Sequence, residues 1–202
     1  MPPKAVMSLL AVVCFWHADK CVCFPNGSVA FSCEDMTPVH PPFTPSTSIP
    51  PVTVSTSSAN YRPGGVITVT VEVLEKSSLE FEGFLLQARS RSQQALLWPV
   101  GKFTNIDTKQ FTALHCKNME NSSVSHASGD KKKKVQLTWE APSNSNYEEI
   151  YFSATLVQDY ARFWVQLNSS SLRLDSTGSS ATGVFYSLAL LFINLLSLPA
   201  YC

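Results

Sequence analysis

Histidine is the first side chain to test for chemistry, because imidazole titrates near neutral pH and is a common metal ligand. Beyond the apolar N-terminus the chain has three histidines, His40, His115 and His126, which stand far apart in sequence. They form no i, i+4 pair, and no cysteine stands at the spacing that zinc sites use. His126 would be a ligand only if the fold brought it to His40, and a structural hydrogen bond is the favoured interpretation. The sequence therefore predicts no metal site.

Motifs of nucleophilic or nucleotide chemistry are absent from the sequence. It contains no Gly-x-Ser-x-Gly elbow, no Gly-rich phosphate loop and no dinucleotide-binding fingerprint. Its carboxylates are too scattered to nominate an acid–base pair. We therefore predict that the protein is not an enzyme, and that it has no catalytic residues and no cofactor.

Three tryptophans, Trp98, Trp139 and Trp164, could stack against sugar rings. Trp139 stands on an alternating apolar face, which favours packing in the core. Trp98 stands beside Pro99 in a turn-like context, which fits a core position and a stacking platform equally well.

Charge gives no indication of a nucleic-acid partner. Lys plus Arg and Asp plus Glu both number 15, so no overall field attracts nucleic acid or anionic lipid. The single concentration of charge is the run from Lys131 to Lys134. A solvated loop is the favoured interpretation of this run, and a partner-binding patch is the alternative.

The N-terminus has the pattern of a secretory signal peptide. Lys4 precedes an apolar run from Ala5 to Trp16, which is shorter than the roughly 20 residues of a membrane span. Cys21 and Cys23 provide small side chains for cleavage, so we expect residues 1–23 to be removed and the mature chain to begin near Phe24. The alternative is a buried N-terminal helix.

The C-terminus has the pattern of a glycolipid-anchor signal. Small residues over 171–183 form a spacer, and residues 184–202 form an apolar tail with no Lys or Arg after it. Ser176 is the first candidate for lipid attachment, followed by Gly178 and Ser179. A single membrane-spanning helix is the alternative, and a buried strand is the third option.

Passage through an oxidising compartment would pair cysteines and glycosylate sequons. Cys14, Cys21, Cys23 and Cys202 fall in the removed ends, which leaves Cys33 and Cys116 to pair. Earlier cleavage would retain Cys21 and Cys23 and make the pairing ambiguous. The three N-glycosylation sequons begin at Asn26, Asn121 and Asn168.

The elements between these ends are strands. Residues 37–58 are rich in Pro, Ser and Thr, so we expect an extended segment that is only partly integrated into a sheet and is a candidate for O-glycosylation. Tyr61-Arg62-Pro63-Gly64-Gly65 predicts a turn, and Gly83 indicates a bulge. No helical period is sustained, and strands at this density are typical of a sandwich or barrel. Alternation of apolar residues predicts strands over 67–73, 79–88, 135–139, 150–156 and 163–167.

Short motifs in a specific order run from Phe24 to about Leu167. They are Phe24-Pro25-Asn26-Gly27, Ser32-Cys33, Met36-Thr37-Pro38-Val39-His40, Tyr61-Arg62-Pro63-Gly64, Phe81-Glu82-Gly83-Phe84-Leu85-Leu86-Gln87-Ala88-Arg89, Trp98-Pro99-Val100-Gly101-Lys102-Phe103, Cys116, Ser125-His126 with Lys133, Trp139-Glu140-Ala141-Pro142 and Tyr151-Phe152-Ser153-Ala154-Thr155. Together they resemble the reeler (reelin N-terminal) domain family, in a single-domain form similar to insect-type defence proteins.

The resemblance implies one all-β domain over residues 24–170, an immunoglobulin-like antiparallel β-sandwich in which Cys33 pairs with Cys116. The Pro/Ser/Thr-rich insert is longer than the family pattern. Ferric-chelate reductases also carry a reeler domain, but they add a haem-binding domain and a cytochrome module for which 202 residues leave no room. Reductase activity is therefore not carried over.

The functional expectation is an extracellular binding protein of the innate-defence type, secreted or held at the cell surface by its C-terminal anchor. It would recognise a microbial surface or glycan through loops and exposed aromatics at one end of the sandwich. The alternative is a cell-adhesion or matrix-interaction module. A third hypothesis, an accessory ectodomain with the metal or electron-transfer chemistry of the reductases, rests on fold kinship alone.

Overall fold

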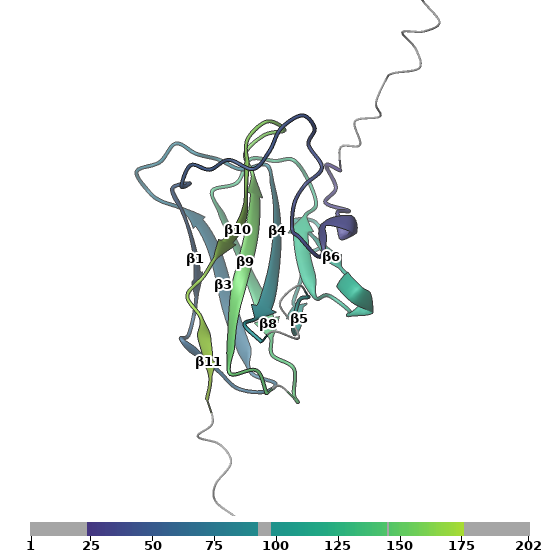
Figure 1. Cartoon of the computed structure of the whole chain (residues 1–202), viewed down its shortest axis with the longest axis vertical. Coiled ribbons are helices and arrows are strands. Elements are labelled where there is room, and N and C mark those ends of the chain that lie inside the picture. Colours follow the sequence, from purple (N-terminus) through teal and green to yellow (C-terminus); the bar gives the residue numbers. More distant parts are fainter. Residues whose placement is uncertain (1–23, 93–97, 145, 176–202) are drawn as a thin grey trace, which may run out of the picture.

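The chain folds into two β-sheets packed face to face (Figure 1), and the computed structural model describes residues 24–92, 98–144 and 146–175. The first sheet has the strand order β1 (Val52–Thr56), β3 (Val66–Val73), β8 (Lys134–Glu140), β5 (Lys102–Thr104). The second has the order β2 (Asn60–Tyr61), β11 (Leu172–Leu174), β9 (Glu149–Val157), β4 (Gly83–Ser90), β7 (Ser123–His126), β6 (Phe111–Leu114), and β10 (Phe163–Asn168) also pairs with β9. The pairings are antiparallel, except for the short parallel pair of β2 with β11. This confirms the predicted antiparallel β-sandwich.

The alternating segments build the core as predicted. In β3, Ile67, Val69, Val71 and Val73 are buried while the residues between them are more exposed. Strand β8 pairs with β3 over seven residue pairs and adds Val135, Leu137 and Trp139 to the same face. Because successive side chains of a strand point to opposite faces, one apolar residue in two is enough to line the space between the sheets.

Strand β4 is buried on both of its faces. Phe84, Leu86 and Ala88 belong to the main core between the sheets, whereas Leu85 belongs to a second cluster with Cys33 and Met36. The second cluster exists because the N-terminal segment, with the 3₁₀ helix η2 (Ala30–Ser32), crosses the outer face of the sheet. The near-continuous apolar run in this strand therefore reflects burial on two sides.

Two strand details differ from the sequence expectations. Gly83 begins β4 and pairs with Val157 in regular register, so the prediction of a bulge at Gly83 is wrong. The bulge lies instead in β10, where the register shifts between Trp164 and Leu167, and Gln166 has a φ of 54°. The extra residue changes the phase of the alternation, so that Trp164 faces the main core together with Leu167.

The Pro/Ser/Thr-rich segment is partly integrated into a sheet, as predicted, because it contributes β1 and no other strand. The domain boundary at residue 170 is corrected by β11, which lies in the predicted spacer. Leu172 is fully buried, and the backbone N–H of Asp175 donates to Tyr61 O at 2.8 Å. A Leu-Arg-Leu strand of three residues is too short to show a readable period.

Candidate binding surface at the loop end of the sandwich

The predicted disulfide is present and lies on the outer face of the second sheet. Cys33 and Cys116 are joined with their Cα atoms 5.6 Å apart, across a sequence separation of 83 residues. Cys116 begins the 3₁₀ helix η4 (Cys116–Asn118), which follows β6. The bond therefore fixes the N-terminal segment to the far edge of the sheet that it crosses.

A buried polar network adds to this attachment. Arg89 is 5% exposed, and its guanidinium donates to the carbonyl oxygens of Cys33 at 3.0 Å and Glu34 at 2.7 Å. Gln87 accepts from Arg89 Nε at 2.9 Å and donates from Nε2 to Cys33 O at 3.0 Å. These two side chains thus hold the N-terminal segment in place.

The N-terminal segment, positioned in this way, forms an apolar pocket of about 170 Å³ at the end of the sandwich that carries the β9–β10 turn. Leu172 of β11 pairs with Ile150 at the start of β9, whereas the β9–β10 turn follows the end of β9. The pocket therefore lies at the end of the sandwich opposite to the one where β11 leads to Asp175 (Figure 1). The pocket is lined by Phe24, Val29, Phe31, Pro38, Val39, His40, Glu82, Val157 and Tyr160.

Aromatic rings surround the pocket and remain partly open to solvent. His40 packs against Tyr160 with ring centroids 4.5 Å apart, and Tyr160 meets Phe43 edge to face at 5.9 Å. Phe24 packs against Phe31 at 5.1 Å. Phe31 is 52% exposed and Phe43 is 44% exposed. Exposed apolar side chains that gather at one site are typical of interaction surfaces.

The histidines are placed by separate contacts. Burial lowers the pKa of His40, and a backbone hydrogen bond with Tyr160 partly opposes this shift. The Nδ1 atom of His40 is buried and has no hydrogen-bond partner among the described residues. His115 Nδ1 accepts from the backbone N–H of Asn121 at 3.2 Å.

His126 has the structural role that the sequence favoured. Its Nδ1 accepts from the backbone N–H of Phe84 at 3.2 Å and lies 3.1 Å from Ser125 Oγ. Burial lowers the pKa of His126, and the charge of Lys132 lowers it further, while the backbone carbonyl oxygen of Phe84, 3.3 Å from Nδ1, and a backbone hydrogen bond with Phe24 oppose this shift. A Cβ at Gly83 would lie 3.0 Å from this ring, so glycine there makes room for the imidazole. Within the described ranges, no group of three or more His, Cys, Asp and Glu side chains is placed to hold a metal ion.

The tryptophans divide between core and surface. Trp139 is fully buried, as predicted, and its Nε1 donates to Val100 O at 3.0 Å; Trp164 is also buried. Trp98 is half-buried, and Lys117 Nζ lies 4.8 Å from the centroid of its ring. The one open tryptophan among the described residues thus already has a cation over its ring.

The lysine run is a solvated surface loop at Lys131 and Lys133, as favoured from sequence, whereas Lys134 begins β8 and Lys132 is partly buried. Lys131, Lys133 and Lys134 are exposed. Lys132 is half-buried, and its Nζ donates to the carbonyl oxygens of Glu82 at 3.1 Å, Ser128 at 2.9 Å and Asp130. Burial lowers the pKa of Lys132. This lysine therefore caps loop carbonyls, a role that the charge run by itself does not reveal.

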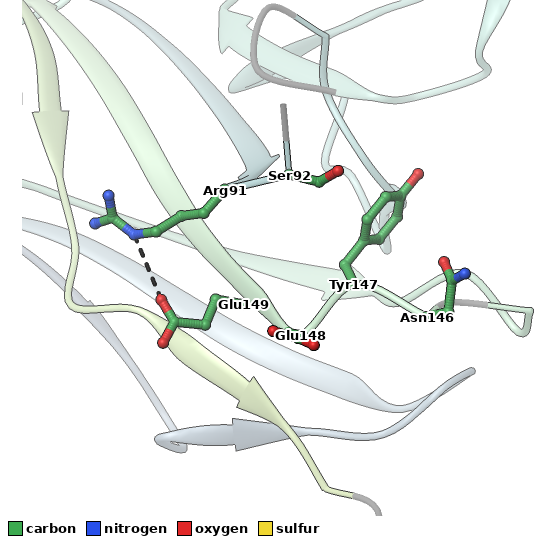
Figure 2. A pocket seen from close by; sticks show the side chains of 6 residues that line it. All are labelled: Arg91, Ser92, Asn146, Tyr147, Glu148 and Glu149. Carbon is green, nitrogen blue, oxygen red and sulfur yellow. Dashed lines mark ion pairs between the residues drawn. The ribbon is translucent and has the colours of Figure 1, made fainter. Parts of the chain in front are cut away.

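A second, polar pocket of about 490 Å³ (Figure 2) lies where β4 ends and β9 begins, at the opposite end of the sandwich. Arg91 Nε lies 3.6 Å from Glu149 Oε2, and Arg173 Nε lies 3.6 Å from Glu149 Oε1. Arg91 also stacks over the ring of Tyr151 at 4.9 Å and donates to Ser171 Oγ at 2.9 Å. Two of the three charged residues that line this pocket, Arg91 and Glu149, are thus paired within the domain, which leaves the pocket less suited to a ligand than the apolar one.

The remaining predicted site residues are distributed over the surface. Asn26 and Asn168 are exposed, and Asn121 is half-buried. Ser176, the predicted signal peptide over 1–23 and the predicted tail over 184–202 lie outside the described residues. In the part of the chain that the structure describes, no helix is long and apolar enough to cross a membrane.

Comparison with known proteins identifies the domain. Residues 31–180 match the family model of the Reeler domain. A crystal structure of the human F-spondin reeler domain superposes with a TM-score of 0.56 at 18% identity, covering 71% of this chain and all of that one.

Two groups of relatives differ in how much of their length is matched. Ferric-chelate reductase 1 of Bos taurus is 37% identical over 157 residues, which are 78% of this chain and 25% of the reductase. "Putative defense protein Hdd11" of Hyphantria cunea is 30% identical over 156 residues, which are 76% of this chain and 90% of that protein. The chain spans about a quarter of the length of the reductases that it matches. The fold, the disulfide and these matches agree, and the chain belongs to the Reeler domain family.

Proposed function

We propose that this chain is an extracellular, non-catalytic recognition module of the defence type, which binds a microbial surface or its glycans through the loop end of the sandwich. The observation that carries the proposal is the apolar pocket, with the exposed rings of Phe31 and Phe43 beside it. Aromatic rings offer flat apolar area at low cost in conformational entropy. The ring of His40 also lines the pocket and adds a polar side chain to it.

The similarity to two insect proteins that are named as defence proteins supports the defence type. The chain corresponds to 90% and 85% of these two proteins. It corresponds to about a quarter of each mammalian reductase. A fold shared with part of a larger enzyme does not carry the activity of the whole enzyme.

The position of the pocket relative to the C-terminal end of the domain also favours the pocket end as the binding surface. The described chain ends at Asp175, directly before the candidate attachment residue Ser176. If a lipid or a spanning helix follows there, the pocket end faces away from the membrane because it lies at the other end of β9.

The test is binding of the protein, expressed in animal cells, to bacteria, to fungi and to their cell-wall polymers at micromolar concentration. Phe31→Ser and Phe43→Ser remove exposed rings at the pocket end. Val66→Ser is the matched control, because Val66 is 61% exposed and begins β3 at the opposite end. We expect each ring substitution to weaken binding by about tenfold, equivalent to about 1.4 kcal/mol, and the control to leave it unchanged.

Two outcomes would contradict the proposal. One is the absence of binding to any of these surfaces at micromolar protein. The other is equal binding by all three variants, which would show that recognition uses a different surface.

A second candidate function is adhesion between cells or to matrix. It is favoured by the Pro-rich segment, where Thr44, Thr47 and Ser48 are exposed and open to O-glycosylation. Aggregation of cells that display the chain with and without its C-terminal anchor distinguishes adhesion from microbial recognition. Metal or electron-transfer chemistry stays the third hypothesis, and purified protein free of iron, copper and haem would remove it.

A further inference from the structure

The three N-glycosylation sequons differ in the solvent exposure of their serine. In two of them the asparagine and the serine two positions later are both exposed, namely Asn26 with Ser28 and Asn168 with Ser170. In the third, Asn121 is half-buried and Ser123 is fully buried. A transferase must reach the asparagine amide and that hydroxyl together, so only the first two are open after folding.

Ser123 is closed off because it is a residue of an interior strand. It begins β7 and is paired with Leu114 in β6 on one side and with Gln87 in β4 on the other. Its hydroxyl lies 3.0 Å from Cys116 Sγ, and since this sulfur is part of the disulfide, the hydroxyl is the donor.

The other two residues of the sequon are also held by the fold. Ser122 is fully buried, and its Oγ accepts from the backbone N–H of Cys116 at 3.1 Å. The backbone carbonyl of Asn121 accepts from Phe103 N at 2.7 Å, and its φ of 49° is left-handed. The sequon is thus wrapped around the disulfide-bonded cysteine.

We propose that closure of the Cys33–Cys116 disulfide and glycosylation of Asn121 are in competition, so that folding withholds the glycan from this sequon and leaves it on Asn26 and Asn168. The proposal rests on the passage through the secretory pathway that the proposed function requires. Asn121 stands five positions after Cys116, so both residues become available at nearly the same moment of synthesis.

The two competing reactions are distinct in their chemistry. In glycosylation, Asn121 Nδ2 forms a bond to C1 of a lipid-linked oligosaccharide; the C1–O bond to the lipid diphosphate breaks, and the amide loses one proton to a base. In disulfide formation, the Cys33 and Cys116 thiols lose two protons and two electrons to the disulfide of an oxidoreductase, which becomes a dithiol.

The experiment measures glycan occupancy at each sequon by peptide mass spectrometry after enzymatic deglycosylation in heavy-oxygen water. The full chain is expressed in animal cells as wild type and as Cys33→Ser, which prevents the disulfide and leaves residues 116–123 intact. Total cellular protein is analysed, so that a variant retained by misfolding is still counted. A second measurement adds a membrane-permeant dithiol to wild-type cells during synthesis.

We expect the wild-type chain to lack a glycan at Asn121 and to carry glycans at Asn26 and Asn168. Cys33→Ser and the dithiol should each allow Asn121 to be glycosylated while Asn26 and Asn168 stay occupied. Equal occupancy of all three sequons in the wild type would overturn the proposal. An Asn121 that stays unmodified under both treatments would also overturn it, because the disulfide would not be what excludes the glycan. A chain with no glycan at any sequon would contradict the secretory passage itself and, with it, this inference.

Discussion

The guanidinium of Arg89 donates a hydrogen bond from Nη2 to the carbonyl oxygen of Cys33 at 3.0 Å. This bond joins a buried cation in the middle of the second sheet to a residue of the disulfide. A buried charge is costly unless it is hydrogen-bonded. Here the backbone of the N-terminal segment and the amide of Gln87 supply the acceptors. Arg89 therefore fixes the position of the N-terminal segment on β4, and this segment lines the pocket at the loop end.

Replacing Arg89 by methionine is expected to lower the free energy of unfolding by about 3 kcal/mol, because it leaves buried acceptors without donors. Urea unfolding of the oxidised protein measures the effect. Arg91→Met is the matched control, since the side chain of Arg91 is 57% exposed and its ion pair is a surface one. The control is expected to change stability by no more than about 0.5 kcal/mol. Equal effects of the two substitutions would show that the network is not stabilising.

Removal of the disulfide by Cys33→Ala with Cys116→Ala is expected to cost about 4–5 kcal/mol, because the bond closes a long loop in the unfolded chain. Thermal unfolding of the oxidised protein and of the double variant measures this cost. Reduction of the wild type must give the same shift as the double variant. Coincident melting curves of oxidised and reduced wild-type protein would refute the expectation.

Gly101→Ala is expected to destabilise the domain by about 2–4 kcal/mol, since it combines a left-handed backbone with a clash in the core. Gly101 has a φ of 67°, and a Cβ there would lie 2.4 Å from Trp139 Cζ2. The matched control is Gly129→Ala, where a Cβ meets nothing within 4 Å. The control is expected to remain within about 0.5 kcal/mol of the wild type. Chemical denaturation of the three proteins decides between them.

Stability is expected to fall as the pH is lowered from neutral. Burial lowers the pKa of His126 and of His40 in the folded chain, whereas in the unfolded chain both titrate near about 6.5. Below that pH the unfolded chain binds more protons, so unfolding becomes easier until the pH passes below the folded pKa values. Protonation of His126 Nδ1 also removes the acceptor of the Phe84 N–H.

His126→Asn tests the source of this pH dependence, because an asparagine Oδ1 can accept the same hydrogen bond and does not titrate. Melting temperatures between pH 5 and pH 8 should vary less in this variant than in the wild type. An unchanged pH profile would assign the dependence to other groups.

The sequence by itself determined the class of the fold, the disulfide and the family. Alternation in Ile67–Val73, Val135–Trp139 and Ile150–Leu156 is sufficient for the class of the fold, because a period of two assigns each side chain to a face without reference to the rest of the chain. The pairing of Cys33 with Cys116 followed once the resemblance was added to the count of cysteines.

Only the tertiary structure decided what the second face of each strand meets. The covering of Leu85 by the N-terminal segment, the packing of Gly83 against His126 and of Gly101 against Trp139, and the bulge in β10 all depend on partners distant in sequence. The pocket depends on distant partners as well, since His40 packs against Tyr160 from the far half of the chain and Phe31 lines the same pocket. The local alternation of apolar residues predicts which side chains are buried, whereas contacts between distant segments determine where in the fold those side chains pack together.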